Sequence, residues 1–284
     1  MFKNPPLLLA HTASCDNGNF VTEDYIIVKD QGQYTLKDRI CPHRAYLMHN
    51  TGDVVKQIEC KLHGFCWNQQ GEPSNDHFYK LANKGDITHG RSGLLFQNFT
   101  EPDAEWVDII ASEKNIRYTK SYTGRSNGSW LWLMDLNSDL LHFRQNGVHP
   151  RQSLETPLET LELRQGDGWC QQINATGFWL FIFPFYQIDY EPGRLSINRI
   201  IPDDINNEYG FSWHNQIYYD DNVDSISRSV FEELLISTYL EDVEVVEKTK
   251  RPFFPLKRGV NKWENHALHW ADWYLKNKIS NKDD

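Results

Sequence analysis

The most constraining feature of the sequence is a pair of short motifs that each combine one cysteine with one histidine. The first motif reads CPHR and contains Cys41 and His43, and the second reads CKLHG and contains Cys60 and His63. Thiolates and imidazoles are side chains with which proteins bind zinc and iron. The segment 41–67 therefore predicts a metal centre whose ligands come from two loops.

The order of the ligands along the chain distinguishes between kinds of centre. A zinc site of two cysteines and two histidines usually pairs cysteine with cysteine and histidine with histidine. Here each motif supplies one of each, which suits a [2Fe–2S] cluster with both thiolates on one iron and both imidazoles on the other. A single zinc ion is the alternative that remains open.

The residue pattern of both motifs resembles the Rieske centre of ring-hydroxylating oxygenases, in which CPHR precedes a stretch like CKLHGFCWNQQGEP. The resemblance implies a Rieske cluster held by Cys41, His43, Cys60 and His63. Respiratory Rieske proteins usually carry an extra cysteine in each loop, joined as a disulfide. The first loop here has none, so Cys66 is expected to be a buried thiol, and the oxygenase type is favoured.

Composition and charge limit the partners of the chain. A chain of 284 residues with 39% hydrophobic residues is long enough for two modest domains with cores of their own. The formal net charge of −10 argues against nucleic acid and against an anionic membrane surface as partners. The five cysteines suit a reducing compartment better than a disulfide framework, so we expect a cytoplasmic protein.

The patterns of turn and apolar residues predict an α+β chain of two domains. Residues 20–100 read as short strands and turns, and the pattern changes at Ser129. We expect a small all-β domain over 1–120 and, over 121–284, helices packed on an antiparallel sheet. In this second domain the pattern predicts helices over 129–147, 224–242 and 264–278 and strands over 178–188, 194–201 and 209–219.

A second metal site is implied by the same resemblance. Oxygenases of this family carry a helix with the pattern N-W-x-x-x-x-E/D-N-x-x-D-x-x-H and then a second histidine; the chain reads SWLWLMDLNSDLLHFRQNGVHP over 129–150. The expected iron ligands are His142 and His149, with six residues between them where four is usual. Seven residues of continuous helix would separate their backbones by roughly 10 Å, so the helix must break, and we expect the break at Asn146-Gly147. An ordinary loop histidine is the alternative for His149.

The third ligand implied by the family is a carboxylate near the end of a late helix, which completes a triad of two histidines and one carboxylate. The stretch FEELLISTYLEDVEVVEK over 231–248 resembles that region, and Asp242 is the expected ligand. Glu241 is the fallback, and a solvated acid at a helix end is the remaining alternative. Asp139 is expected to share a helix face with His142. The matching aspartate in the family bridges an iron ligand to a cluster histidine of a neighbouring subunit, which implies a role in electron transfer.

Taken as a whole, the chain resembles the α-subunit type of Rieske non-haem iron oxygenases, with a β Rieske domain, a helix-grip catalytic domain and a trimeric assembly. The resemblance implies that an external reductase, with or without a ferredoxin, supplies electrons. O₂ and a mononuclear Fe(II) would then hydroxylate or demethylate a small organic substrate. Because the chain has no G-x-G-x-x-G segment, NAD(P)H would be oxidised by the reductase. A Rieske electron carrier and a redox-sensing binding protein, each with an iron-free second domain, stay open.

Overall fold

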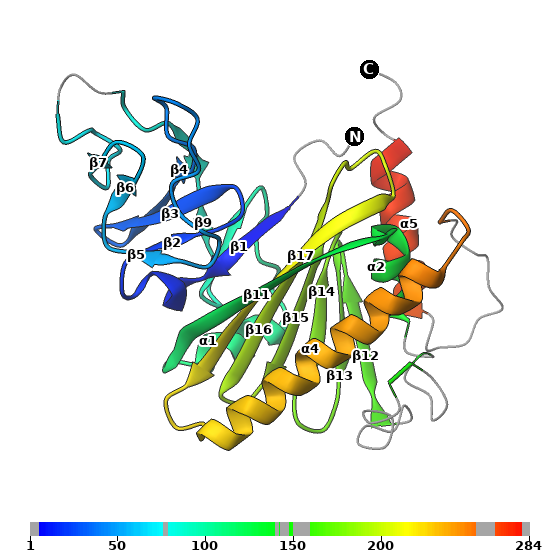
Figure 1. Cartoon of the computed structure of the whole chain (residues 1–284). Coiled ribbons are helices and arrows are strands. Elements are labelled where there is room, and N and C mark those ends of the chain that lie inside the picture. The colour runs from blue at the N-terminus through cyan, green and yellow to red at the C-terminus, as the bar shows by residue number, and fades with distance from the viewer. Residues whose placement is uncertain are drawn as a thin grey trace. The chain divides into compact units, whose positions relative to one another are not determined.

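The computed structural model describes residues 6–75, 79–139, 142, 148–149, 160–253 and 265–279, and Figure 1 shows the course of the chain. The chain divides into two compact units, Pro6–Ser121 and Tyr122–Asp284. Short strands dominate the first unit, whereas the second unit combines one large sheet with helices.

The first unit consists of small sheets. A five-stranded sheet has the order β5-β2-β3-β4-β8, a three-stranded sheet has the order β1-β10-β9, and β6 and β7 form a separate pair. A single turn of 3-10 helix (Thr12–Cys15) and the helix α1 (Glu105–Ser112) complete its regular structure. The strands are β1 (Leu7–His11), β2 (Asn19–Val21), β3 (Tyr25–Asp30), β4 (Gln33–Asp38), β5 (Val54–Val55), β6 (Ile58–Cys60), β7 (Phe65–Trp67), β8 (Asn83–Asp86), β9 (Thr88–His89) and β10 (Leu94–Gln97).

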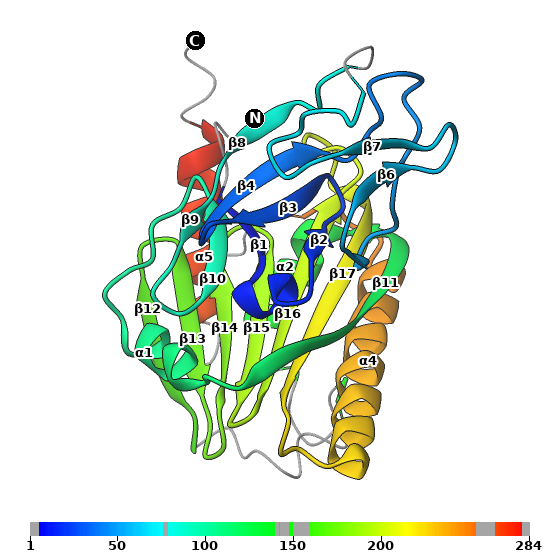
Figure 2. The same cartoon turned by 90° about the vertical axis from the view of Figure 1, so that its left-hand side faces the viewer.

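Local sequence explains the central hairpin of this unit. The strand β3 reads YIIVKD, and its β-branched centre is fully buried. It joins β4 through Gln31 and Gly32, whose φ angles of 48° and 82° match the twist of a two-residue hairpin turn. Figure 2 shows β3 and β4 side by side, with the short pair β6 and β7 beyond their ends. The buried residues Val21, Ile26, Val28, Met48, Ile58, Trp67 and Leu81 form one core cluster, which also contains Cys41 and Cys60.

The second unit is built on a seven-stranded sheet with the order β11-β17-β16-β15-β14-β13-β12. The strands β12 to β17 pair antiparallel with their sequence neighbours. The helix α4 lies diagonally across one face of this sheet, and α2 packs beside α5 (Figure 1). The bounds are β11 (Ile116–Ser129), α2 (Trp130–Ser138), β12 (Glu162–Gly166), β13 (Trp169–Ile173), β14 (Phe178–Ile182), β15 (Tyr186–Glu191), β16 (Arg194–Pro202), β17 (Tyr209–Asp220), α4 (Ser225–Lys248) and α5 (Asn265–Ile279).

Two helices of this unit begin at residues that cap them. Ser129 accepts a hydrogen bond from the backbone N–H of Trp132 at 3.3 Å, so it can stand where the family pattern has asparagine. At the start of α4 the Asp224 carboxylate accepts from the N–H groups of Ile226 and Ser227 at 3.0 and 2.9 Å. These caps satisfy backbone donors that a helix leaves without intrahelical partners.

The structure confirms an α+β fold with helices on an antiparallel sheet, and it corrects several boundaries. The run 178–188 is two strands, because the chain turns at Phe183-Pro184 between β14 and β15. The strands β12 and β13 were not expected from the sequence. The first helix of this unit ends at Ser138 instead of reaching 147, and α4 continues to Lys248, beyond the expected end at 242.

Within the described residues, no helix is long and apolar enough to cross a membrane.

Candidate metal centres

The first motif pair is carried by two loops of the first unit. Cys60 ends β6 and Phe65 begins β7, so residues 61–64 form the turn that presents His63. In the first loop the N–H of Ala45 donates to the carbonyl of Cys41 at 2.9 Å. These tight turns fix one cysteine and one histidine on each loop.

The four motif side chains divide by burial. Cys41 and Cys60 are buried, with 1% and 0% of each residue exposed, whereas His43 is partly buried and His63 is exposed. The two imidazole rings face each other with centroids 4.8 Å apart and planes inclined by 67°. Cys66 is partly exposed, so the expectation of a buried thiol there is wrong, and all five cysteines are free. Both cysteines of the motifs are thus enclosed by the protein, and of the two imidazoles that of His63 is the more exposed.

The pKa of the Cys60 thiol is raised on balance, although two backbone N–H groups point to its sulfur. Burial raises the pKa of its thiol, the backbone N–H groups of Leu62 and His63 donate toward it and lower the pKa, and the adjacent Cys41 thiol raises it again. A bound cation would deprotonate both thiols, and N–H donors to the sulfurs would stabilise the thiolates. The donor set therefore fits an iron–sulfur cluster.

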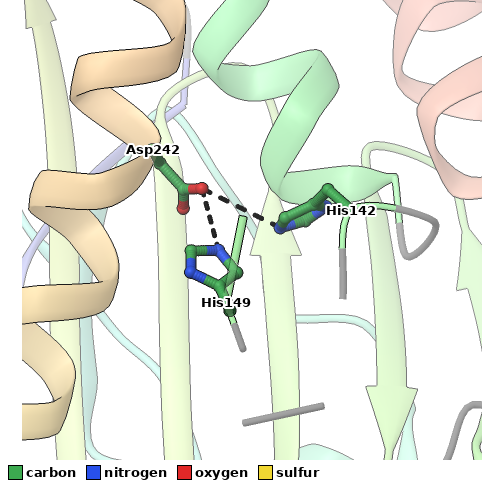
Figure 3. A group of neighbouring side chains, drawn as sticks. All are labelled: His142, His149 and Asp242. Atoms are coloured by element: carbon green, nitrogen blue, oxygen red, sulfur yellow. Dashed lines mark ion pairs between the residues drawn. The ribbon is translucent and has the colours of Figure 1, made fainter. Parts of the chain in front are cut away.

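The second unit brings His142 and His149 together with Asp242, which comes from the distant helix α4 (Figure 3). Asp242 Oδ1 lies 2.9 Å from His149 Nε2 and 3.9 Å from His142 Nε2. The two imidazole centroids are 5.0 Å apart. All three residues are at least nine-tenths buried. Two imidazoles and one carboxylate that converge in this way fit a facial triad for iron, with positions left for other ligands.

The path of the chain explains how two histidines so close in sequence can face one point. The helix α2 ends at Ser138, and Asp139 has extended backbone angles of φ −92° and ψ 111°. Asp139 and His142 are therefore not on one helix face, and that expectation is wrong. The N–H of Val148 donates to the carbonyl of His142 at 3.0 Å, so the backbones of these two residues lie next to each other. The expected break at Asn146-Gly147 lies outside the described residues.

Each imidazole is held on the side away from Asp242. His142 Nδ1 contacts the backbone carbonyl of Asp139, and His149 Nδ1 lies 2.8 Å from Glu241 Oε2. An oxygen partner at Nδ1 fixes the ring and directs Nε2 to a metal. Glu241, the fallback ligand, thus contacts the outer side of His149, while Asp242 faces both Nε2 atoms. Sequence spacing could not separate these adjacent acids, because only the direction of each side chain distinguishes them.

The protonation of the two histidines differs. Burial lowers the pKa of His142 to about 4, although Asp242 opposes this shift, so His142 is neutral near pH 7. Burial also lowers the pKa of His149, but Asp242 and Glu241 together outweigh burial and raise it. A metal ion bound by Asp242 and His149 would take the place of that proton.

A cavity of about 340 Å³ opens beside the triad, and both His142 and Asp242 line it. Its floor is one face of β13 to β17 and its wall is α4. Of the aromatic side chains between residues 178 and 186, Trp179 and Phe181 reach the cavity. The side chains of Phe231, Leu234, Leu235 and Thr238, which share one stripe of α4, form the apolar part of the wall. The cavity is large enough for a small organic molecule next to the triad.

Glu241→Ala is expected to weaken Fe(II) binding at the triad by about 10- to 100-fold, because it removes the oxygen that orients His149. Glu241→Gln keeps an acceptor at that position and should lose less. Titration of the metal-depleted protein with Fe(II) under anaerobic conditions measures the change. Glu244→Ala, an exposed acid on the same helix, serves as the matched control. An affinity of the Glu241→Ala protein within twofold of the unchanged protein would show that His149 needs no such support.

Comparison with known proteins bears on both units. Residues 8–81 match the model of the Rieske [2Fe-2S] domain. No curated protein sequence matches the chain. The quaternary ammonium Rieske monooxygenase CntA, in complex with its substrate L-carnitine, has a similar structure with a TM-score of 0.73 and 13% identity, over 98% of this chain and 88% of that one. NdmA of Pseudomonas putida CBB5, with caffeine, gives a TM-score of 0.55 and 14% identity over 99% and 92% of the two chains. The chain thus contains a Rieske [2Fe-2S] domain and has the fold of Rieske oxygenases, as its motifs predicted.

Proposed function

We propose that this protein is the oxygenase component of a Rieske non-haem iron system, which uses O₂ and external electrons to hydroxylate or demethylate a small organic substrate. The observation that carries the proposal is the convergence of His142, His149 and Asp242 beside a cavity, in a chain that also has a Rieske domain. A purely electron-carrying protein has no need of a buried triad that opens on a cavity of this size.

The ligands divide between the two units. Cys41 and Cys60 would bind one iron of the cluster, and His43 and His63 the other. In the second unit His142, His149 and Asp242 would hold Fe(II), with Glu241 and the Asp139 carbonyl fixing the two rings. When bound, the cluster supplies single electrons and the mononuclear iron supplies the site at which O₂ is activated.

The side chains of the second unit prepare the site for a reaction that must exclude water. The triad is buried, and the stripe of α4 that contains Phe231 and Leu235 covers the adjacent cavity with apolar surface. A substrate in the cavity would contact His142 and Asp242 directly, because both line it. The position of a carbon atom relative to the triad would then decide which bond is attacked.

Other proteins would complete the system. Electrons would come from a reductase that oxidises NAD(P)H, directly or through a ferredoxin. A trimer is the proposed assembly, and a structure of CntA is described in terms of inter-subunit electron transfer, which supports contact between subunits. The five free cysteines suit a reducing compartment, so we place the protein in the cytoplasm.

Iron content and turnover test the proposal. Protein reconstituted anaerobically should contain about three irons per chain, two in the cluster and one at the triad. After reduction with dithionite it should show the EPR signal of a Rieske cluster. With a surrogate reductase, O₂ uptake should depend on an organic substrate from a panel of small molecules. Two irons per chain and no substrate-dependent O₂ uptake would instead identify an electron carrier or a sensor. A colourless protein with zinc would exclude the carrier and the sensor as well, because each of them needs the Rieske cluster.

A further inference from the structure

The floor of the cavity has a chemical character that the triad does not explain. The register of the sheet places Gln172 opposite Trp179, Trp179 opposite Asp189, and Asp189 opposite Ser196. Residues directly opposite on antiparallel strands point to the same face. Gln172, Trp179 and Asp189 all line the cavity, so an indole ring and a carboxylate lie next to each other on its floor.

Asp189 is held in place rather than exposed to solvent. Only 7% of the residue is accessible; Ser196 Oγ donates to one carboxylate oxygen at 2.7 Å and Gln187 Nε2 to the other at 2.8 Å. Each carboxylate oxygen can accept more than one hydrogen bond, so both retain capacity for a ligand. Neither partner carries a positive charge, and the negative charge of Asp189 is therefore not neutralised by these contacts.

Amide oxygens on the same cavity lining also lack donors. Asn137 Oδ1, Gln172 Oε1 and Asn215 Oδ1 are buried and accept no hydrogen bond from the described residues. A buried acceptor without a partner costs about 1–3 kcal/mol, so donors supplied by a ligand would stabilise its complex. Asn137 in turn donates to Gln187 at 3.1 Å, and Gln187 donates to Asp189, so these three side chains belong to one connected network.

The charge of the cavity has one sign. Among the described residues that line it, the acids are Asp189, Glu191 and Asp242, and none is lysine or arginine. Arg194 pairs with Glu191 at 2.9 Å but is not part of the lining. After Asp242 is assigned to the metal and Glu191 to Arg194, the charge of Asp189 remains for a ligand.

We propose that the cavity binds an organic cation that carries N–H groups, such as a protonated amine or a guanidinium, with its charge at Asp189 and Trp179. This deepens the proposed function, since the same cavity would hold the substrate. The carboxylate attracts the charge, the indole face adds a cation–π contact, and the amide oxygens accept the N–H groups. Gln187 lies about 7 Å along β15 from Asp189 and contacts Asn137 of α2. The rest of the ligand would extend from the cation site toward His142 and Asp242.

Calorimetric binding to the purified full chain, without reductase or O₂, tests this proposal independently of turnover. The probes are phenethylammonium, its N,N,N-trimethyl derivative, 2-phenylethanol and 3-phenylpropanoate, which share one ring and differ in charge and N–H groups. We expect phenethylammonium to bind at least about tenfold more tightly than the alcohol and the carboxylate. The trimethyl derivative should lie between the amine and the alcohol, because it keeps the charge but donates no hydrogen bond.

Variants locate the site. Asp189→Asn keeps the shape of the side chain and should reduce phenethylammonium affinity at least about tenfold while leaving 2-phenylethanol unchanged. Asp272→Asn removes the same charge from an exposed position on α5 and should change neither. Should Asp189→Asn fold poorly, Trp179→Leu provides a second test. This variant should lose affinity only for the two cationic probes, and the loss should be smaller than the loss expected for Asp189→Asn.

Several outcomes would overturn the proposal. Equal or tighter binding of 3-phenylpropanoate would exclude a cation site, and equal binding of the trimethyl derivative would exclude the role of the N–H groups. An unchanged affinity of the Asp189→Asn protein for phenethylammonium would place the charge elsewhere. None of these results would alter iron content or O₂ uptake, so failure here remains distinct from failure of the proposed oxygenase function.

Discussion

His149→Ala is expected to lose the mononuclear iron and all product formation while the Rieske spectrum stays intact. His149 Nε2 lies 2.9 Å from Asp242 Oδ1, so the imidazole occupies the place from which it would bind the ion with that carboxylate. A triad reduced to two protein ligands holds Fe(II) poorly. The cluster ligands lie in the other compact unit and are untouched by the change. Iron analysis, the EPR spectrum of the reduced protein and product formation measure the three parts of this result.

Matched variants make the test specific. His142→Ala should behave as His149→Ala does, because the two imidazoles face the same carboxylate. His269→Gln, a histidine of α5 that contacts the carbonyl of Gly166, should keep its iron. If His142→Ala abolished activity while His149→Ala kept iron content and rate near the original values, the triad would need another third member.

The first site could be predicted from sequence because its information is local. Each loop carries its cysteine and histidine within four residues, and short spacing of this kind survives any arrangement of the rest of the chain. The fold class followed from equally local signals, such as the short strand-like runs and turns over 20–100 and the apolar stripe of the helix predicted over 224–242. The exposure of Cys66 could not be obtained in the same way, since burial depends on which distant segments pack over a loop.

The second site was predicted by resemblance rather than by periodicity. The apolar pattern after Trp130 continues past Ser138, so it predicted a longer helix than exists. In the structure the Ser138 hydroxyl donates to the carbonyl of Met134 at 2.8 Å, and the next residue is already extended. A serine that competes for helix carbonyls is a weak signal in a sequence. The position of His149 next to His142 is accompanied by the hydrogen bond from Val148 to His142, which spacing alone does not show.

The cavity was the least predictable part of the site, because the residues that line it become neighbours only through the pairing register of the strands. Trp179 and Asp189 are ten residues apart and become neighbours only through the pairing of β14 with β15. The polar strands β12, ELRQG, and β13, WCQQI, lack the alternation that marks a strand, yet β13 supplies Gln172 to the cavity floor. Tertiary pairing overrides such weak local preference.

Asp139→Asn is expected to leave both metal sites loaded but to reduce turnover by about 100-fold. Iron should stay bound because His142 Nδ1 contacts the backbone carbonyl of residue 139, which the substitution retains. The side-chain charge is lost, and the resemblance assigns to that charge the link between an iron ligand and a cluster histidine of a neighbouring subunit. The variant thus separates the carbonyl, which orients the ring, from the carboxylate, which is proposed to lie on the electron route.

Reoxidation of the cluster gives the most direct measure of that route. The reduced Asp139→Asn protein should show the same EPR signal as the unchanged protein, but on addition of O₂ and substrate its cluster should reoxidise about 100-fold more slowly. Asp221→Asn, which removes an exposed carboxylate after β17, should reoxidise at the original rate. Loss of iron from Asp139→Asn would mean that both the carboxylate and the backbone carbonyl of Asp139 support His142. Unchanged reoxidation and unchanged product formation would place Asp139 off the electron route, and the path between the two centres would then have to run through another residue near His142.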